Sequence, residues 1–320
     1  MNRKEINFDV IIIGGGAAGI SAALWCDDLK LNALLLEREA ELGGQLPRVY
    51  NPIKNHLGIE TQNGSEMRDR FVKQIENRRF TIRLESEIAR VNLRKKSVTL
   101  GGGETFSAEA IIIAAGVRRR KLNVAGEDEF RDRGIIESGK RDADLLKDKN
   151  VCVIGGGDAA FENALILAET AASVTLVHRR EIFRARAEFI EQARSNPKIM
   201  TLTETAVRKI SGGGRIEAVE LENLKTRKTF VRNIQAVLIR IGVEPNTDFL
   251  RGQIELDEGG YVKINQNCET SIENIFAVGD AANPIAPTIS SAVGMGATAA
   301  KAISFKSKVR SPKSKVENGS

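Results

Sequence analysis

Val10-Ile11-Ile12-Ile13-Gly14-Gly15-Gly16-Ala17-Ala18-Gly19 joins an apolar run to a glycine-rich turn. The segment Val151-Cys152-Val153-Ile154-Gly155-Gly156-Gly157-Asp158-Ala159-Ala160 repeats this arrangement 141 positions later, counted between the first glycines (155 − 14). Each apolar run predicts a buried strand, and each turn predicts the entry to a helix. Glycines let the backbone approach a pyrophosphate, and the helix N-terminus favours its negative charge. A single such turn is weak evidence, but the pair predicts two dinucleotide sites.

The residues that follow the two glycine turns differ in charge. About twenty residues past the first turn, where such folds contact the ribose, a second apolar run ends in Glu37. Its carboxylate can accept hydrogen bonds from an unphosphorylated ribose diol. At the matching place past the second turn stands His178-Arg179-Arg180, with Arg184 one turn on. Because guanidinium groups suit a 2′-phosphate, the second site is predicted to take NADPH. A pair of tight turns with incidental charges would leave this change of sign unexplained.

The remainder of the chain repeats one plan twice. Short strands are expected near 81–84, 89–93 and 97–100, and again near 201–208, 216–222 and 228–233. Each set leads to a buried strand with a small-residue exit, Ala115-Gly116 in the first half and Ile241-Gly242 in the second. The plan predicts an internal duplication of two similar dinucleotide-binding domains.

Gly279-Asp280 leaves a further apolar strand near the end of the chain. A Gly-Asp pair in that position is the usual way such folds bring a carboxylate to a ribitol chain. The second domain is therefore expected to be inserted into the first. We predict an α/β protein with one domain from 1–118 and 246–305, a second from 119–245, and a disordered basic tail at 306–320.

Composition places the chain among ordinary globular proteins. Its 320 residues are 42% hydrophobic and 28% charged, without an apolar run near the roughly 20 residues that a membrane span needs. The first residues lead directly into a strand without a secretory signal, so a cytoplasmic location is expected. The net charge is +6. Without a nucleic-acid motif, an acidic protein partner explains this charge better.

The three cysteines are Cys26, Cys152 and Cys268. They are widely spaced and form no CxxC pair, so neither a disulfide nor a metal site is predicted. Cys26 falls on the first helix and Cys152 within a buried strand. Both are expected to fill core space.

These features together resemble the low-molecular-weight thioredoxin reductase family of flavoproteins. The resemblance spans residues 8–303 and rests on several motifs: GGGAAGISAAL at 14–24, LGGQL at 42–46, GGGDAAFENAL at 155–165, LVHRREIFRA at 176–185, IGVEPNT at 241–247 and FAVGD at 276–280. The family has an FAD domain with an NADPH domain inserted in it, and is usually a homodimer. The resemblance implies the same for this chain, with two Rossmann-like, three-layer ββα domains.

Matching the family's motifs assigns residues to each cofactor. Those implied for FAD are Gly14, Gly16, Ala17, Ala18, Gly19, Glu37, Gly44, Gln45, Tyr50, Asn55, Ile88, Ala115, Gly116, Gly279, Asp280, Thr288 and Ile289. Those implied for NADPH are Gly155, Gly157, Asp158, Ala159, Ala160, His178, Arg179, Arg180, Arg184, Ile241 and Gly242. Gln45, Tyr50 and Asn55 can also be ordinary loop residues.

The chain departs from the family at the redox-active dithiol. Thioredoxin reductases carry CxxC followed by Asp before the second glycine turn, and that slot here reads Ser138-Gly139-Lys140-Arg141-Asp142. Without a sulfur there, the chain lacks the thiolate that would relay electrons from flavin to thioredoxin. A second departure is Ala286-Pro287-Thr288-Ile289, where members often read Arg-Gln-Ala-Ile.

The expected activity is transfer of electrons from NADPH through FAD to ferredoxin or flavodoxin. A branch of the superfamily without the dithiol works in this way and carries a Tyr five residues after the Gln of GGQ, the spacing of Gln45 and Tyr50. That branch tends to have a longer C-terminal extension, which this chain lacks. Two alternatives stay open: a disulfide reductase that uses another thiol or an external dithiol, and a regulatory protein that binds nucleotides without turnover.

Overall fold

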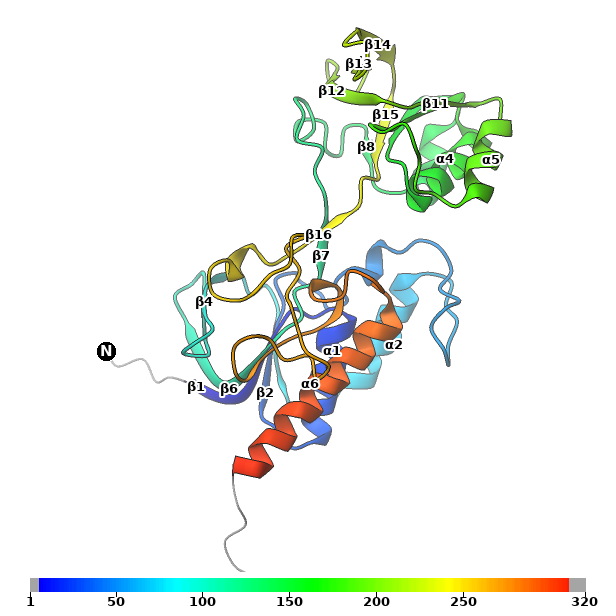
Figure 1. The fold of residues 1–320 in the computed structure, drawn as a ribbon. Helices are drawn as coiled ribbons and strands as arrows, with labels where there is room; N and C mark the ends of the chain where they lie inside the picture. The colour runs from blue at the N-terminus through cyan, green and yellow to red at the C-terminus, as the bar shows by residue number, and fades with distance from the viewer. Residues whose placement is uncertain (1–5, 311–320) are drawn as a thin grey trace, which may run out of the picture. The chain divides into compact units, whose positions relative to one another are not determined.

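A computed structural model describes residues 6–310 of the 320. The chain forms two compact units (Figure 1). Unit 1 combines the residues up to Arg118 with those from Glu244 onward, and unit 2 is Arg119–Val243. Unit 2 is thus an insertion within the sequence of unit 1. It ends two residues before the expected limit at 245 (245 − 243).

Each unit contains three of the six α-helices described. In unit 1 the elements are α1 (Ala17–Asp28), α2 (Gly64–Ile75), α6 (Ile289–Arg310), β1 (Ile6–Ile13), β2 (Ala33–Leu36), β3 (Thr81–Arg83), β4 (Ile88–Asn92), β5 (Ser97–Leu100), β6 (Thr105–Ile113) and β17 (Ile275–Ala277). In unit 2 they are α3 (Gly139–Asp142), α4 (Asp158–Thr170), α5 (Ala187–Ser195), β8 (Ile135–Ile136), β9 (Asn150–Ile154), β10 (Ser173–Val177), β11 (Ile199–Leu202), β12 (Thr205–Ser211), β13 (Ala218–Asn223), β14 (Thr229–Asn233) and β15 (Ala236–Ile239). At the two crossings, β7 (Val117–Arg119) pairs with β16 (Val243–Pro245).

A parallel sheet forms the centre of each unit. Its order is β3-β2-β1-β6-β17 in unit 1 and β11-β10-β9-β15-β8 in unit 2. The strand before each glycine turn is therefore central, and the following strands occupy matching places. The two sheets differ in the strand at the end of this order. In unit 1 it is β17, which follows the insertion in sequence, and in unit 2 it is β8, which precedes β9. The predicted duplication and the α/β fold class are confirmed.

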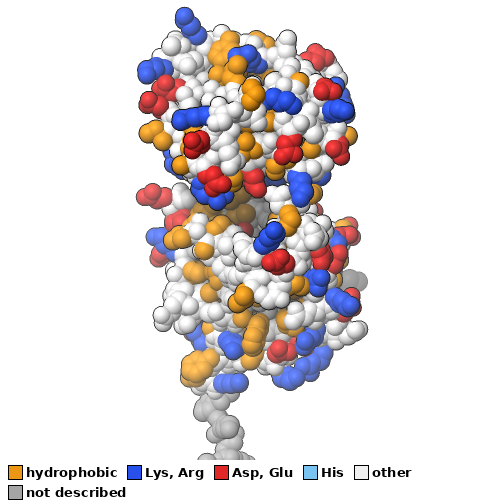
Figure 2. Space-filling view, turned by 90° about the vertical axis from the view of Figure 1, so that its right-hand side faces the viewer, with side chains coloured by type: hydrophobic (Ala, Val, Ile, Leu, Met, Phe, Trp, Pro, Cys, Tyr) orange, Lys and Arg blue, Asp and Glu red, His pale blue; other side chains and the backbone are white. Residues whose placement is uncertain are grey.

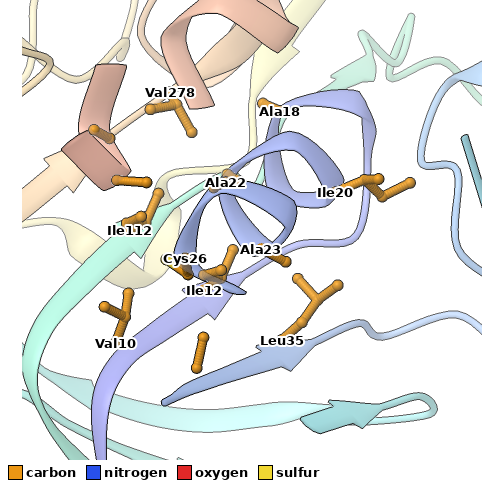
Figure 3. Packing of buried hydrophobic residues seen from close by; sticks show 14 of the residues in the cluster. Val10, Ile12, Ala18, Ile20, Ala22, Ala23, Cys26, Leu35, Ile112 and Val278 are labelled. Carbon is orange, nitrogen blue, oxygen red and sulfur yellow. The ribbon is translucent and has the colours of Figure 1, made fainter. Parts of the chain in front are cut away.

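Both faces of the unit 1 sheet are covered, which explains the continuous apolar run of β1. Val10 and Ile12 point to one side, where they pack with α1 and α6, as Figure 3 shows around Cys26 and Ala22. Ile11 belongs to the cluster on the other side. A strand whose two faces are both buried cannot alternate apolar with polar residues.

The layer opposite the helices is an antiparallel β-meander in each unit. In unit 1 it consists of β4, β5 and the first part of β6, whose last part pairs instead with β17. In unit 2 it is the separate sheet β12-β13-β14. Apolar residues of this sheet, Val207, Val219 and Leu221, share a core with Cys152 of β9. Each unit therefore has the expected three-layer ββα architecture.

The glycine that follows each central strand must lack a side chain. A Cβ on Gly14, whose φ is +108°, would lie 2.4 Å from the carbonyl oxygen of Ala114. A Cβ on Gly155, whose φ is +155°, would lie 2.2 Å from the carbonyl oxygen of Arg240. Ala114 and Arg240 follow β6 and β15, the equivalent strands of the two units. The same backbone contact thus fixes both turns.

Two expectations about the elements are wrong. The strand expected over 201–208 is two strands, β11 and β12, because the chain turns between them. Glu204 has a φ of +49°, and the Thr205 hydroxyl donates to the carbonyl of Thr203 at 2.7 Å. The predicted disordered tail is helical over 306–310, since α6 continues to Arg310. Lys306 stabilises this end through an ion pair with Glu269. Residues 311–320 lie outside the described part.

The packing of α6 on α1 predicts opposite effects for two glycines of α6. A Cβ at Gly296 would lie 2.4 Å from the carbonyl oxygen of Ala18, whereas a Cβ at Gly294 would meet nothing within 4 Å. We expect Gly296→Ala to lower the unfolding free energy by about 1–3 kcal/mol through overpacking. Gly294→Ala should raise it by about 0.5–1 kcal/mol, because Ala is the better helix former.

Denaturant titrations of the two variants at one FAD concentration measure both values. Equal changes of the same sign in the two variants would show that α6 does not pack closely on α1.

Candidate functional site

A cavity of about 530 Å³ opens at the carboxyl ends of the parallel strands of unit 1. Its walls include Ile13 at the end of β1, Leu36 at the end of β2 and Ala114 just past β6. This is the edge at which open α/β sheets bind ligands, because turns and helix N-termini converge there. Its volume is typical of a site for an organic cofactor.

Most residues that the sequence predicted for the flavin meet in this cavity. Those that line it are Gly14, Gly16, Ala17, Ala18, Glu37, Gly44, Gln45, Ile88, Ala115, Gly116, Gly279, Asp280, Thr288 and Ile289. They come from segments as far apart in sequence as the first glycine turn and the start of α6. Their convergence supports one ligand held by all of them.

Glu37 is held rigidly at the end of β2. Its side chain is buried, and its two carboxylate oxygens accept hydrogen bonds from the backbone N–H groups of Gly15 at 2.7 Å and Glu39 at 2.9 Å. A carboxylate oxygen can accept more than one hydrogen bond. Glu37 therefore fits a ribose diol, whose hydroxyl groups donate.

Asp280 presents a carboxylate without a donor. Within the described residues nothing donates a hydrogen bond to it, and burial raises the pKa of its carboxyl. The residue follows Gly279, whose φ of +67° turns the chain at the end of β17. A desolvated carboxylate at the cavity wall fits the donating hydroxyl groups of a ribitol chain.

Part of the cavity wall was missed from the sequence. Arg118, Asn246 and Asp248 line it, and Arg118 joins the wall through hydrogen bonds to Asn246 at 3.3 Å, Asp248 at 2.7 Å and Glu244 at 2.8 Å. The Asn246 side chain donates to the carbonyl of Ala115 at 2.8 Å. One feature of the sequence could have indicated this part of the wall. Four basic residues in a row, 118–121, stand where the chain is expected to pass from the first domain to the second.

Three residues predicted for the flavin lie outside the cavity lining. A Cβ on Gly19 would lie 1.8 Å from the carbonyl oxygen of Gly14, so this glycine allows α1 to pack closely against the turn. Tyr50 and Asn55 are also absent from the wall. An antiparallel bridge between Ile53 and Thr61 closes a separate loop, on which Asn55 is exposed.

The second glycine turn is covered by the segment that follows β10. The backbone N–H groups of Arg184 and Ala185 donate to the carbonyl of Gly156, at 2.7 and 3.1 Å. The ring of His178 packs so closely that a Cβ on Gly156 would lie 2.4 Å from it. Asp158, at the start of α4, pairs with Arg186 at 3.0 Å. The predicted residues of this site are thus neighbours around one turn.

Three arginines of this segment remain available to an anion. Arg179, Arg180 and Arg184 are exposed, and none forms an ion pair with another described residue. Burial lowers the pKa of His178, and the three nearby guanidinium charges lower it further. The three guanidinium groups therefore create a positive field that no carboxylate of the described residues neutralises. Such a field favours the binding of a phosphate. Ile241 and Gly242 follow β15, as Ala115 and Gly116 follow β6.

The slot that would hold a dithiol forms a closed polar cap. Ser138 begins α3, and its hydroxyl accepts from the backbone N–H of Arg141 at 3.5 Å. Asp142 accepts from the backbone of Glu137 and Ser138 and from the guanidinium of Arg141. Burial alone would raise the pKa of Asp142, but these hydrogen bonds hold it below its usual range. Asp142 therefore acts as a structural anion.

None of the three cysteines can replace the missing pair as a thiolate. All are buried, and burial raises the pKa of Cys26 and Cys152 to about 12 and that of Cys268 to about 11. The charge of Asp9 adds to the effect on Cys26. The thiolate is the reactive form, so these sulfurs are inert at neutral pH.

Comparison with known proteins identifies the class. Residues 8–296 match the family described as pyridine nucleotide-disulphide oxidoreductase, and the chain belongs to that family. It is 35% identical over 303 residues to a thioredoxin reductase of Mycolicibacterium smegmatis, covering 93% of this chain and 96% of that protein. A 34.2 kDa protein in the rubredoxin operon of Clostridium pasteurianum is 28% identical over 299 residues, with 93% and 96% covered.

Solved structures agree with this class. The crystal structure of Lactococcus lactis thioredoxin reductase in the FR conformation superposes with a TM-score of 0.82 at 31% identity, covering 95% of this chain and 99% of that one. Thioredoxin reductases use FAD and NADPH, and this chain is an NADPH-dependent flavoprotein oxidoreductase of that type. Among residues 6–310, no helix combines the length and the apolar character that a membrane span requires.

The net positive charge is not gathered on the face that Figure 2 shows. Lys and Arg side chains are interspersed there with Asp and Glu. Many arginines are paired locally, as Arg118 is with Glu244 and Asp248. An acidic partner that bound this face would therefore have to recognise a local arrangement of residues rather than the charge of the whole face.

The desolvation of Asp280 predicts a variant that folds better and binds flavin worse. Because its pKa is raised in the folded state, the unfolding free energy falls as pH rises from about 3.9, the pKa expected of an unfolded Asp, to the raised value. In flavin-free protein at pH 7, Asp280→Asn should therefore increase the unfolding free energy, and the gain should vanish below about pH 3. The Kd for FAD should rise about tenfold, since a charge-assisted hydrogen bond is lost.

Denaturant titration against pH and a fluorescence titration with FAD measure the two effects. The exposed Asp144 provides the control, since Asp144→Asn should change neither. A Kd for FAD that stays unchanged in Asp280→Asn would remove this carboxylate from the flavin site.

Proposed function

We propose that this protein passes electrons from NADPH through FAD directly to ferredoxin or flavodoxin, without a protein dithiol. The observation that carries the proposal is the slot at 138–142, where hydrogen bonds engage the polar groups that replace the two sulfurs. Electrons that cannot leave through a thiolate must leave from the flavin itself. NADPH supplies two electrons, so two one-electron carriers are reduced and one proton is released for each NADPH.

The residues of unit 1 fit FAD. In this proposal the first glycine turn holds the pyrophosphate, Glu37 the adenosine ribose and Asp280 the ribitol chain. Gln45 donates to the carbonyl of Val117 at 3.0 Å, which fixes the wall on the isoalloxazine side. When bound, FAD supplies the ability to accept a hydride and to release electrons singly. The protein positions it and excludes water.

The residues of unit 2 fit NADPH. The second glycine turn would hold the pyrophosphate, with Arg179, Arg180 and Arg184 on the 2′-phosphate. Neutral His178 would pack beside them without adding charge. The lack of ion pairs on these arginines within the described chain supports this role, because a bound phosphate would otherwise compete with carboxylates.

A disulfide reductase remains the second candidate. It is favoured by the relatives named thioredoxin reductase, among them the proteins of Mycolicibacterium smegmatis and Lactococcus lactis. With every cysteine buried, such an enzyme would need an external dithiol as its first electron acceptor. We further propose a homodimer and a cytoplasmic location, as the family resemblance implies.

The arginine cluster predicts the nucleotide preference. Replacing Arg179 and Arg180 together by Ala removes charge-assisted hydrogen bonds of about 1.5–3 kcal/mol each. The Michaelis constant for NADPH should therefore rise by at least about 100-fold, while that for NADH changes little. Arg194→Ala, an exposed arginine on α5, is the matched control. Equal losses with both nucleotides would place the two arginines away from the 2′-phosphate.

The missing dithiol predicts which acceptors work. A panel of ferredoxin, flavodoxin, thioredoxin and a neutral quinone, each with NADPH as donor, should give fast reduction of the two carriers and of quinone. Thioredoxin should be reduced slowly or not at all. A variant with Cys26, Cys152 and Cys268 changed to Ala should keep these rates, allowing for some loss of stability at three buried sites.

The same panel separates the two candidates. Thioredoxin reduction that disappears when a single cysteine is replaced would favour the disulfide reductase and refute direct transfer from flavin. If a catalytic amount of a small disulfide enables the Cys-free variant to reduce thioredoxin at the expense of NADPH, and does not do so without enzyme, the external-dithiol form is supported instead.

A further inference from the structure

We propose that two neighbouring loops beside the cavity, 53–61 and 283–288, form the surface on which an acidic one-electron carrier protein docks. This inference rests on the proposed function, whose acceptor it locates. We call the two loops the docking loops. Their tips carry Leu57 and Ile285, which are 99% and 95% exposed, more than any other large apolar side chain in the described part of the chain.

The docking loops are joined to each other. Nδ1 of His56, in the first loop, lies 3.0 Å from the hydroxyl oxygen of Ser290, in the first turn of α6, which directly follows the second loop. Ile53 and Ile59 share a hydrophobic cluster with Ile289, also in that turn. Segments 234 residues apart in sequence (290 − 56) thus lie together. In Figure 1 the first loop projects from unit 1 beyond α2.

The exposed tips belong to ordered loops. The pairing of Ile53 with Thr61, through two hydrogen bonds of 2.9 and 3.1 Å, closes the first loop. In the second, Asn283 both donates to and accepts from Ala286, and the Ser291 hydroxyl donates to Ala286 at 2.5 Å. Their fixed shape keeps Leu57 and Ile285 in water, although burying such side chains is favourable. Apolar side chains held in this way mark an interaction site.

The surface is continuous with the cavity. Pro287, Thr288 and Ile289 line the cavity and lead directly from the second loop, and Arg48 and Val49 line it just before the first. A protein seated on the docking loops would therefore lie against the wall that holds the flavin. Electron transfer requires the carrier to lie close to the flavin. A carrier bound elsewhere on unit 1 would lie farther from this wall.

The charges near the tips select an acidic partner. The first loop carries Lys54 and one exposed carboxylate, Glu60, and Arg48 lies just before it, whereas no charged residue of either sign occurs over 281–300. Lys54 is exposed and makes no ion pair among residues 6–310. With Arg48 and Lys54 against the single carboxylate of Glu60, the apolar centre has a small excess of positive charge, which complements a carrier with an acidic rim.

The test compares Leu57→Ser, Ile285→Ser and Lys54→Glu with wild type, using the full-length FAD-bound enzyme. The control is Leu145→Ser, an apolar side chain that is 78% exposed in unit 2. Binding of oxidised ferredoxin and oxidised flavodoxin is measured by calorimetry, and their reduction and that of a neutral quinone are measured with NADPH. Sedimentation gives the mass of each variant.

Each Ser variant should raise the Kd and the KM for the carriers about tenfold, as expected for an interface anchor. Quinone reduction, FAD content and mass should match wild type and the Leu145→Ser control. Lys54→Glu should weaken carrier binding most at low salt, where the Debye length is roughly 30 Å, and less at 0.1 M, where it is about 10 Å.

Two outcomes would overturn the proposal while leaving the acceptor in place. Unchanged carrier binding in all three variants would place the docking surface elsewhere. A lower sedimentation mass in the Ser variants would assign the docking loops to an interface between copies of this chain. If wild type itself reduces neither carrier, the proposed function fails first, and the stated occupant of this surface fails with it.

Discussion

The close contact between each glycine turn and the exit of a neighbouring strand controls the rest of this structure. Gly14 lies against the carbonyl of Ala114, and Gly155 lies against that of Arg240, at distances that a side chain would not allow. Each contact brings the helix N-terminus and the exits of the parallel strands to one edge of the sheet. A site for a pyrophosphate follows from this geometry before any specific side chain is considered.

On this shared frame, one position distinguishes the two units. The second glycine of each turn packs against the residue that follows the second strand, Glu37 in unit 1 and His178 in unit 2. Glu37 is an acceptor held by backbone N–H groups. His178 is followed by Arg179 and Arg180, which are exposed and without counter-ions among the described residues. The same backbone therefore offers hydrogen-bond acceptors to one ribose and positive charge to the other.

The position at which the family carries its dithiol has a different hydrogen-bonding role in this chain. Asp142 stands where the family has an Asp after its CxxC motif, but here it binds backbone N–H groups and Arg141. Because these bonds lower its pKa, the carboxylate stays charged and cannot supply a proton near neutral pH. If electrons leave from the flavin itself, as we propose, the loops beside the cavity that carry Leu57 and Ile285 become the proposed contact for the acceptor.

The local features of this protein could be predicted from its sequence. The glycine turns, the apolar strands, and the charges after the second strand of each unit are encoded within short segments, because they depend on backbone geometry and on period-two burial. Most cavity residues followed from these motifs. What only the tertiary structure decided depends on contacts between distant segments. Arg118 reaches Asp248 across 130 positions, and the pairing of Ile53 with Thr61 closes a loop on which Asn55 is exposed and outside the cavity lining. Residues 306–310, which their basic composition predicted to be disordered, continue α6, and Lys306 forms a non-local ion pair with Glu269.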